Sequence, residues 1–179
     1  MPTRRRRTGR RFSPITNKIW STTILGGSTI GSGTTSDLGN LLLNAESTLG
    51  HNIYDATVLR VRGDLNLLSA AGSSPGDIGV VTLGILVADD DLAAGGNFPE
   101  PDQDQGDWLY RRSFPVVVHS DQPASLAYRL IGGDVHIDNK SMRKIENAHQ
   151  GLHLVAIHDG GLGSNPSIHG GLNVLVGLR

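Results

Sequence analysis

The sequence predicts an all-β fold, a single jelly-roll β-sandwich of about eight antiparallel strands with one short helix near residues 36–49. Glycine accounts for 24 of 179 residues and aromatic residues for only 4%. Together with many Thr, Ser and Val residues, this composition favours turns and strands over long helices. Short apolar runs, bounded by turn residues, recur along the chain as they do in β-sandwiches. Other sandwich topologies fit this pattern almost as well as a jelly roll.

The first elements are a strand and a helix. The strand is predicted over residues 15–25, and a flexible glycine-rich connection follows it. The helix is predicted over residues 36–49, because Ser36 can cap its first amide groups and Gly50 can end it. Between them, apolar residues recur at helical spacing and form one stripe: Leu38, Leu41, Leu42, Ala45 and Leu49.

The clearest strand is predicted over residues 53–68. Apolar Leu59, Val61, Leu65 and Leu67 alternate with polar Arg60, Arg62, Asp64 and Asn66. This period of two indicates one buried face and one wet face. Gly63 falls on the apolar side, so we expect it to mark a bulge or a close approach of backbones.

The remaining strands are predicted from shorter apolar runs. They cover residues 78–88, 108–118, 127–138, 151–159 and 167–179. Pro115 interrupts one of them, which predicts an edge or bent strand. Residues 139–149 are predicted to form a short helix or a turn, and residues 89–107 a long acidic loop.

Charge divides the chain into two predicted parts, an arm over residues 1–12 and a folded domain over residues 13–179. The net charge is −1, but six of the 16 basic residues lie in the arm, so the domain keeps 10 basic and 17 acidic residues. Like charges repel and the arm has little apolar surface to bury, which predicts disorder without a partner. The candidate nucleic-acid-binding residues are Arg4, Arg5, Arg6, Arg7, Arg10 and Arg11.

The arm is suited to phosphate rather than to base recognition. Guanidinium groups stay charged and bind phosphate bidentately, and no aromatic residue precedes Phe12. Six contacts would release about five counterions from duplex DNA or about four from a single strand. One arm is therefore a weak, salt-sensitive binder, whereas many arms in one assembly bind strongly. A nuclear localisation patch, a membrane-surface patch and a solvated tail are the alternatives.

Histidines and acidic residues raise the possibility of a metal site. His149, His153 and His158 lie close in sequence, but the chain lacks the His-x-His pair that cupin-like metal sites use, so we expect interface or surface histidines. The acidic loop 89–107 resembles the start of a calcium loop, but no Glu stands at its closing position. We therefore expect neither a resident metal nor a cofactor, although calcium between subunits stays open.

Enzymatic signatures are missing from the sequence. The chain contains no Gly-x-Ser-x-Gly elbow, no phosphate loop and no dinucleotide fingerprint. No apolar run is long enough to span a membrane. A mixed-charge segment at Lys140, Arg143 and Lys144 is expected to be a subunit contact, a second basic spot or a solvated turn. These observations predict a protein that is not an enzyme.

RRRRTGRR ahead of a strand-rich domain resembles the layout of coat proteins from small icosahedral viruses. The resemblance is architectural and covers the whole chain loosely. It implies a self-assembling shell of about 60 subunits, a virion location with possible passage through the nucleus, and contact between the arm and a DNA or RNA genome. The acidic domain further suggests that the inner wall adds little to genome binding.

Two other functions fit parts of the sequence. A non-viral nucleic-acid-binding module would normally carry basic charge on its folded surface, which the acidic domain argues against. A cupin-like or sugar-binding sandwich would need a polar or metal cluster, which the histidine spacing does not supply. Assembly state separates these functions, because only the coat protein should form megadalton particles.

Overall fold

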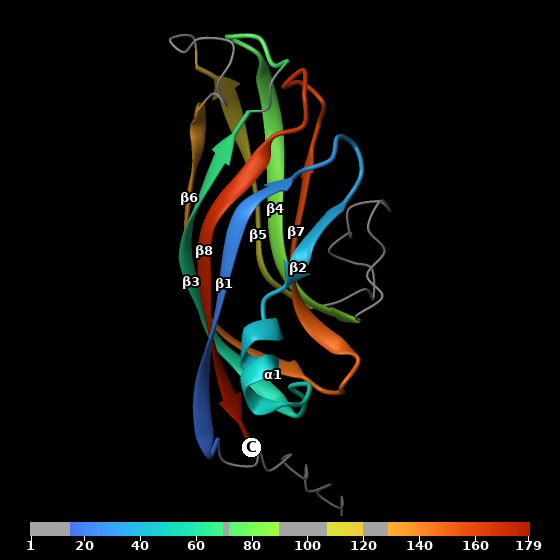
Figure 1. Cartoon of the computed structure of the whole chain (residues 1–179), viewed down its shortest axis with the longest axis vertical. Helices are drawn as coiled ribbons and strands as arrows, with labels where there is room; N and C mark the ends of the chain where they lie inside the picture. The colour runs from blue at the N-terminus through green and yellow to red at the C-terminus, as the bar shows by residue number, and fades with distance from the viewer. Residues whose placement is uncertain (1–14, 70–71, 90–106, 120–128) are drawn as a thin grey trace, which may run out of the picture.

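The computed structural model describes residues 15–69, 72–89, 107–119 and 129–179, and these form eight strands and one short helix (Figure 1). In chain order the elements are β1 (Asn17–Thr29), β2 (Ser36–Asn40), α1 (Leu43–Leu49), β3 (Ala56–Leu68), β4 (Ile78–Asp89), β5 (Asp107–Val118), β6 (Arg129–Ile145), β7 (Gln150–His158) and β8 (Ser167–Leu178). Every pairing between these strands is antiparallel.

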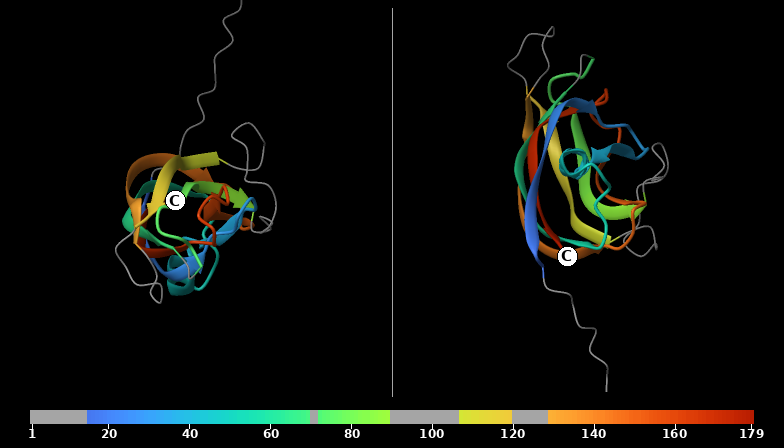
Figure 2. Two further views of the ribbon diagram at one scale, coloured as in Figure 1. Left: turned by 90° about the horizontal axis from the view of Figure 1, so that it is seen from above. Right: turned by 60° about the horizontal axis from the view of Figure 1, so that its bottom comes forward.

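The strands are hydrogen-bonded in the order β1-β8-β3-β6-β5-β4-β7-β2. Within the described residues, β5 and β6 are joined through the pairs Val117–Ile131 and Val118–Leu130. The series therefore folds over at this point into two layers, β1-β8-β3-β6 and β5-β4-β7-β2, which face each other in Figure 2. Every link between consecutive strands crosses from one layer to the other, except β4 to β5. This is the strand order of a jelly-roll sandwich, and it confirms the predicted fold class.

The core fills the space between the two layers. Val61 on β3 and Val174 on β8 are fully buried from one side, and Leu83 and Leu154 on β4 and β7 are fully buried from the other. Burying one such side chain contributes about 1.5–3 kcal/mol to folding. The inward and outward positions alternate along each strand, so the core also fixes which side chains point to solvent.

β3 confirms the predicted alternation and explains Gly63. Val61 and Leu65 are buried, whereas Arg62 and Asp64 are exposed. Gly63 pairs with Leu172, and a Cβ atom at Gly63 would collide with the backbone carbonyl of Gly171 on β8. The predicted close approach is therefore present. Leu59 departs from the pattern, because the register shifts between Val58 and Arg60.

The predicted helix over residues 36–49 is partly wrong, because its first five residues form β2. The Ser36 hydroxyl accepts a hydrogen bond from the Gly31 amide at 2.7 Å instead of capping a helix. Pairing with β7 makes this segment a strand, and the positive φ of 117° at Gly39 is incompatible with a right-handed helix. The helix that does form, α1, ends as predicted at Gly50, which has a φ of 75°.

The predicted helix or turn over residues 139–149 is also wrong over most of its length. β6 continues to Ile145, and Lys140, Arg143 and Lys144 pair with β3 rather than lying in a loop. Ile145 is fully buried, which anchors this extension to the core. Pro115 pairs with Val80 on β4, whereas the described pairs between β5 and β6 are at Val117 and Val118, so Pro115 lies in a part of β5 that is an edge as predicted.

Candidate nucleic-acid interface

The six predicted binding arginines, from Arg4 to Arg11, lie outside the described residues. The domain to which they are attached begins at Ile15, and β1 starts by pairing Asn17 with Leu178 at the end of β8. The Thr16 amide also donates to the Leu178 carbonyl at 2.9 Å. The arm therefore joins the domain at the end of the β1-β8-β3-β6 layer that carries the C-terminus (Figure 1).

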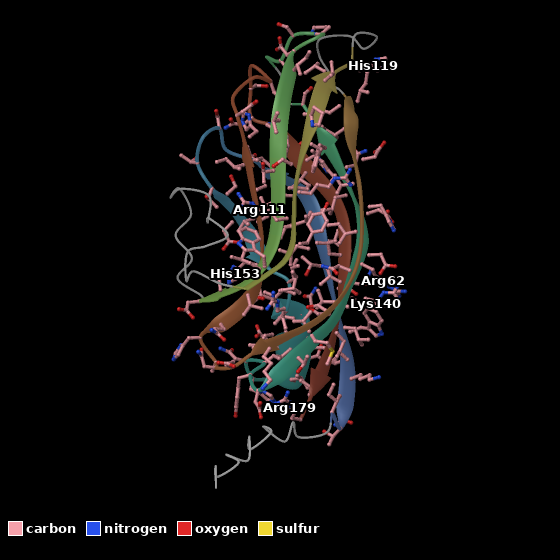
Figure 3. The ribbon with its side chains drawn as sticks, turned by 180° about the vertical axis from the view of Figure 1, so that it is seen from behind. Arg62, Arg111, His119, Lys140, His153 and Arg179 are labelled. Atoms are coloured by element: carbon pink, nitrogen blue, oxygen red, sulfur yellow. The ribbon has the colours of Figure 1, made fainter. Side chains whose placement is uncertain are left out.

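The outer face of this layer carries cationic side chains near the same end. The register aligns Trp20, Leu175, Arg60 and Lys140 across the four strands in one row. The next row aligns Thr22, Asn173, Arg62 and Asp138. Adjacent strands lie about 4.8 Å apart, so each row spans roughly 15 Å. Figure 3 shows Arg62 and Lys140 beside each other on the outer side of the sheet.

We call Lys18, Arg60, Arg62 and Lys140 the basic end of this face. Lys18 lies two residues before Trp20 on β1, so both side chains are on the outer side, and both are exposed. The Arg62 guanidinium lies 4.6 Å from the centre of the Trp20 ring, a cation–π arrangement that holds both groups at the surface. Trp20 keeps 44% of its surface exposed.

Arg60 forms an ion pair with Asp138 on β6. Its Nε and Nη2 atoms donate to the two oxygens of Asp138 at 2.7 and 2.6 Å. These hydrogen bonds lower the pKa of Asp138 and raise the pKa of Arg60. The basic end therefore contains four cations and one adjacent carboxylate, which leaves it positive.

The other half of the same face has acidic character. Asp64 and His136 are paired across β3 and β6, with 2.7 Å between Nδ1 and Oδ1. One row further, Asn66 donates to Asp134. With His169 these residues line a shallow pocket of about 420 Å³. Charge on this face is therefore segregated along the strands, with the basic end nearest the arm.

The basic end was missed by the sequence prediction, and only part of it could have been found. Alternation in residues 59–67 already placed Arg60 and Arg62 on the wet side of β3. Lys140 falls in the segment predicted as a short helix or turn, and that prediction hides its position beside Arg60. The basic end exists because β3 and β6 pair in one particular register. Arg60 and Asp138, which this register brings together, are 78 residues apart in the sequence, so local spacing does not reveal the contact.

His153 and His158 are buried, which corrects the expectation of interface or surface histidines. His153 is 4% exposed, and its Nδ1 atom lies 3.0 Å from Oδ2 of Asp37 on β2. Burial by itself raises the pKa of Asp37, but the hydrogen bonds from His153 and the Gly39 amide outweigh it, and the pKa is lowered. This pair connects β2 to β7.

His158 has a different role in the fold. The Gly160 amide donates to its Nδ1 atom at 3.0 Å, so Nε2 carries the proton in the neutral ring. Nε2 then donates to the Asn165 side-chain oxygen at 3.0 Å. His158 is 2% exposed and stabilises the turn between β7 and β8.

No metal centre or membrane helix is present in the part of the chain that the structure describes. Its His, Asp and Glu residues do not gather in groups of three that could hold a metal ion. None of its helices has the length and hydropathy needed to cross a membrane. Most of the acidic loop with the calcium-like sequence, residues 90–106, lies outside the described residues.

An apolar patch lies on the outer surface where β5 of the second layer meets β6 of the first layer. Ile78 and Val80 on β4 pair with Val117 and Pro115 on β5, and Val117 pairs with Ile131 on β6. Ile78, Val80 and Ile131 are 63%, 39% and 55% exposed. We call these five residues the apolar patch. Their clustering across three strands distinguishes them from single exposed hydrophobic residues, which are common.

Comparison with protein-family models and with curated proteins finds no match. Among solved structures, infectious bursal disease virus of the Gx strain aligns over 88% of this chain and 32% of its own, with 11% identity and a TM-score of 0.42. The VP2 subviral particle of infectious bursal disease virus aligns over 89% and 33%, with 14% identity and a TM-score of 0.38. This chain thus spans about a third of those chains, and with TM-scores below 0.5 the likeness does not establish a shared fold.

Proposed function

We propose that this chain is the coat protein of a small icosahedral virus, a structural subunit that assembles with copies of itself and packages the genome. The observation that carries the proposal is the pairing of six arginines within the first eleven residues with an acidic jelly-roll domain. A polycation on a separate segment binds a polyanion through its phosphates, while the acidic body stays soluble. The role is structural rather than catalytic.

Assembly is supported by the surface of the domain. The apolar patch exposes Ile78, Val80 and Ile131 on neighbouring strands, and clustered apolar side chains typically mark protein contacts. Its occupant in this proposal is a second copy of the chain. A closed shell of about 60 identical subunits would bury such surfaces symmetrically and bring about 60 arms together.

A non-viral nucleic-acid-binding protein is the second candidate, and the basic end of the β1-β8-β3-β6 face favours it. Such a module would bind nucleic acid through both the arm and the folded surface. It would act as a monomer or small oligomer. Particle formation therefore separates this candidate from the coat protein.

Genome packaging is tested by replacing all six arm arginines with glutamine in the full chain. Particles of the wild-type protein, purified from the cells that express it, should contain nucleic acid, as judged by the ratio of absorbance at 260 and 280 nm. The arm variant should form particles with little nucleic acid, because its sequence-independent phosphate contacts are lost.

Arg111→Gln with Arg112→Gln is the matched control, because both residues are exposed on β5, a strand of the other layer. This control should retain the nucleic acid. Equal nucleic-acid content in wild type and the arm variant would contradict a packaging role for the arm.

A further inference from the structure

The domain has an excess of acidic residues, yet its cations are not evenly spread. Four of the cations in the described residues form the basic end on the outer face of β1-β8-β3-β6. The arm is attached at the start of β1, a strand of the same face. Lys18 and Trp20 lie within six residues of Ile15, where the described chain begins. The described residues nearest in sequence to the arm are therefore part of, or beside, the basic end.

We propose that the basic end, formed by Lys18, Arg62, Lys140 and the paired Arg60, is a second phosphate-binding surface that continues the arm onto the folded domain. Its ligand is single-stranded nucleic acid. The inference rests on the proposed function, and it replaces the expectation that the domain adds little to genome binding.

An exposed aromatic side chain beside the cations favours single-stranded nucleic acid as the ligand. Single-strand binding surfaces combine a positive track for the backbone with aromatic side chains beside it. Trp20 is 44% exposed and lies in the row of Arg60 and Lys140, under the guanidinium of Arg62. The Arg62 guanidinium contacts the Trp20 ring, and within the described residues it forms no ion pair with a carboxylate, so its charge can act on phosphate.

The acidic half of the face limits the binding surface. Asp64 and Asp134 lie one and two rows beyond Arg62, and both are exposed. Their charge repels phosphate, so a bound strand would be confined to the rows nearest the arm. A bound single strand would therefore run along the boundary between the basic end and the acidic half of the face.

The test measures how the affinity of the full chain for a labelled oligothymidylate depends on salt. Arg62→Gln with Lys140→Gln should reduce the slope of log K against log salt by about 1.4, since each phosphate contact on a single strand contributes about 0.7. Over a fourfold increase in salt, this variant should lose about sevenfold less affinity than wild type. Arg111→Gln with Arg112→Gln, which removes two exposed cations from β5, should leave the slope unchanged.

A single substitution covers the case in which the double variant folds poorly. Lys18→Gln lies on the edge strand β1 and should reduce the slope by about 0.7. A second readout uses Trp108→Phe, which leaves Trp20 as the only tryptophan in the chain. Oligothymidylate should quench its fluorescence at low salt and release it at high salt.

An unchanged slope in Arg62→Gln with Lys140→Gln would overturn the inference. If the same variant also stopped particle assembly, the basic end would instead be a contact with an acidic surface of a neighbouring subunit. Failure of the proposed function has a different result. A wild-type chain that forms no particles can still bind oligothymidylate, and the slope of log K against log salt can still be measured. The slope therefore reports on the surface, and particle formation reports on the coat-protein function.

Discussion

At the scale of single residues, Gly63 shows how closely the strands of the β1-β8-β3-β6 layer approach. A methyl group at this position would collide with the Gly171 carbonyl on β8, in the middle of a sheet where the cross-strand neighbours Leu172 and Ile137 are buried. Backbone atoms in a central strand cannot move without disturbing the ladder on both sides. Gly26 offers a contrast on β1, because a Cβ atom there would meet nothing within 4 Å.

Gly63→Ala should lower the free energy of unfolding by about 1–3 kcal/mol, the usual cost of forcing extra volume into a packed site. Gly26→Ala should change it by less than about 0.5 kcal/mol, as expected for an uncrowded surface position. Urea unfolding of both variants measures the difference. Equal effects would show that the close approach at Gly63 contributes nothing special to stability.

Predictability from the sequence also differs from residue to residue. The outward direction of Arg62 followed from alternation within its own strand, so it could be predicted. The burial of His153 could not, because it depends on a hydrogen bond to Asp37, 116 residues away. The sequence around a histidine on a short apolar strand is the same whether the side chain contacts water or a carboxylate from a distant segment.

At the scale of elements, β2 shows where a periodic pattern gives the wrong structure. Leu38, Leu41 and Leu42 fit a helical stripe, but a short segment gains more from pairing with β7 than from an uncapped first turn. The same reason extends β6 past Asn139, because β3 offers a partner along this whole stretch. Strand pairing is a tertiary property, and local spacing alone cannot reveal it.

The Asp37–His153 pair joins β2 to β7 and makes the stability of this edge depend on pH. The pKa of Asp37 is lowered below its ordinary value of 3.8 in the folded state. A lowered carboxyl pKa stabilises the fold at pH values above 3.8, and this contribution is lost as the pH falls through the folded pKa. The edge strand β2 should therefore loosen in acid.

Asp37→Asn should lower the free energy of unfolding by about 1–2 kcal/mol at pH 6, because a hydrogen bond to a charged, half-buried group is lost. Its stability should then fall less than that of wild type between pH 4 and pH 2.5. Asp55→Asn is the control, since Asp55 pairs with Arg179 at 3.3 Å but is 66% exposed, and exposed pairs contribute little. Parallel pH curves for wild type and Asp37→Asn would contradict this account.

At the scale of the whole molecule, the fold class and most strands could be predicted, whereas the surfaces could not. Strands such as β4 and β8 follow from local apolar runs that any sandwich requires. The basic end and the apolar patch each combine residues from at least three strands. Their existence depends on the order of strands in the sheet, which is decided by the packing of the complete chain.

Charge is organised at this scale in three zones. The arm is cationic, the near half of the β1-β8-β3-β6 face is basic, and the remaining domain carries the acidic excess. A net charge of −1 conceals this arrangement. In a closed shell the arrangement would place most positive charge on one side of the wall, which suits the packaging of a polyanion.

The central claim is self-assembly, and sedimentation velocity of the purified full chain tests it most directly. The account predicts a uniform particle on the order of a megadalton, since about 60 copies of a 19.0 kDa chain would form the smallest closed shell. A 19.0 kDa monomer or a dimer at every protein and salt concentration would contradict it, and would leave the non-viral nucleic-acid-binding protein as the better description.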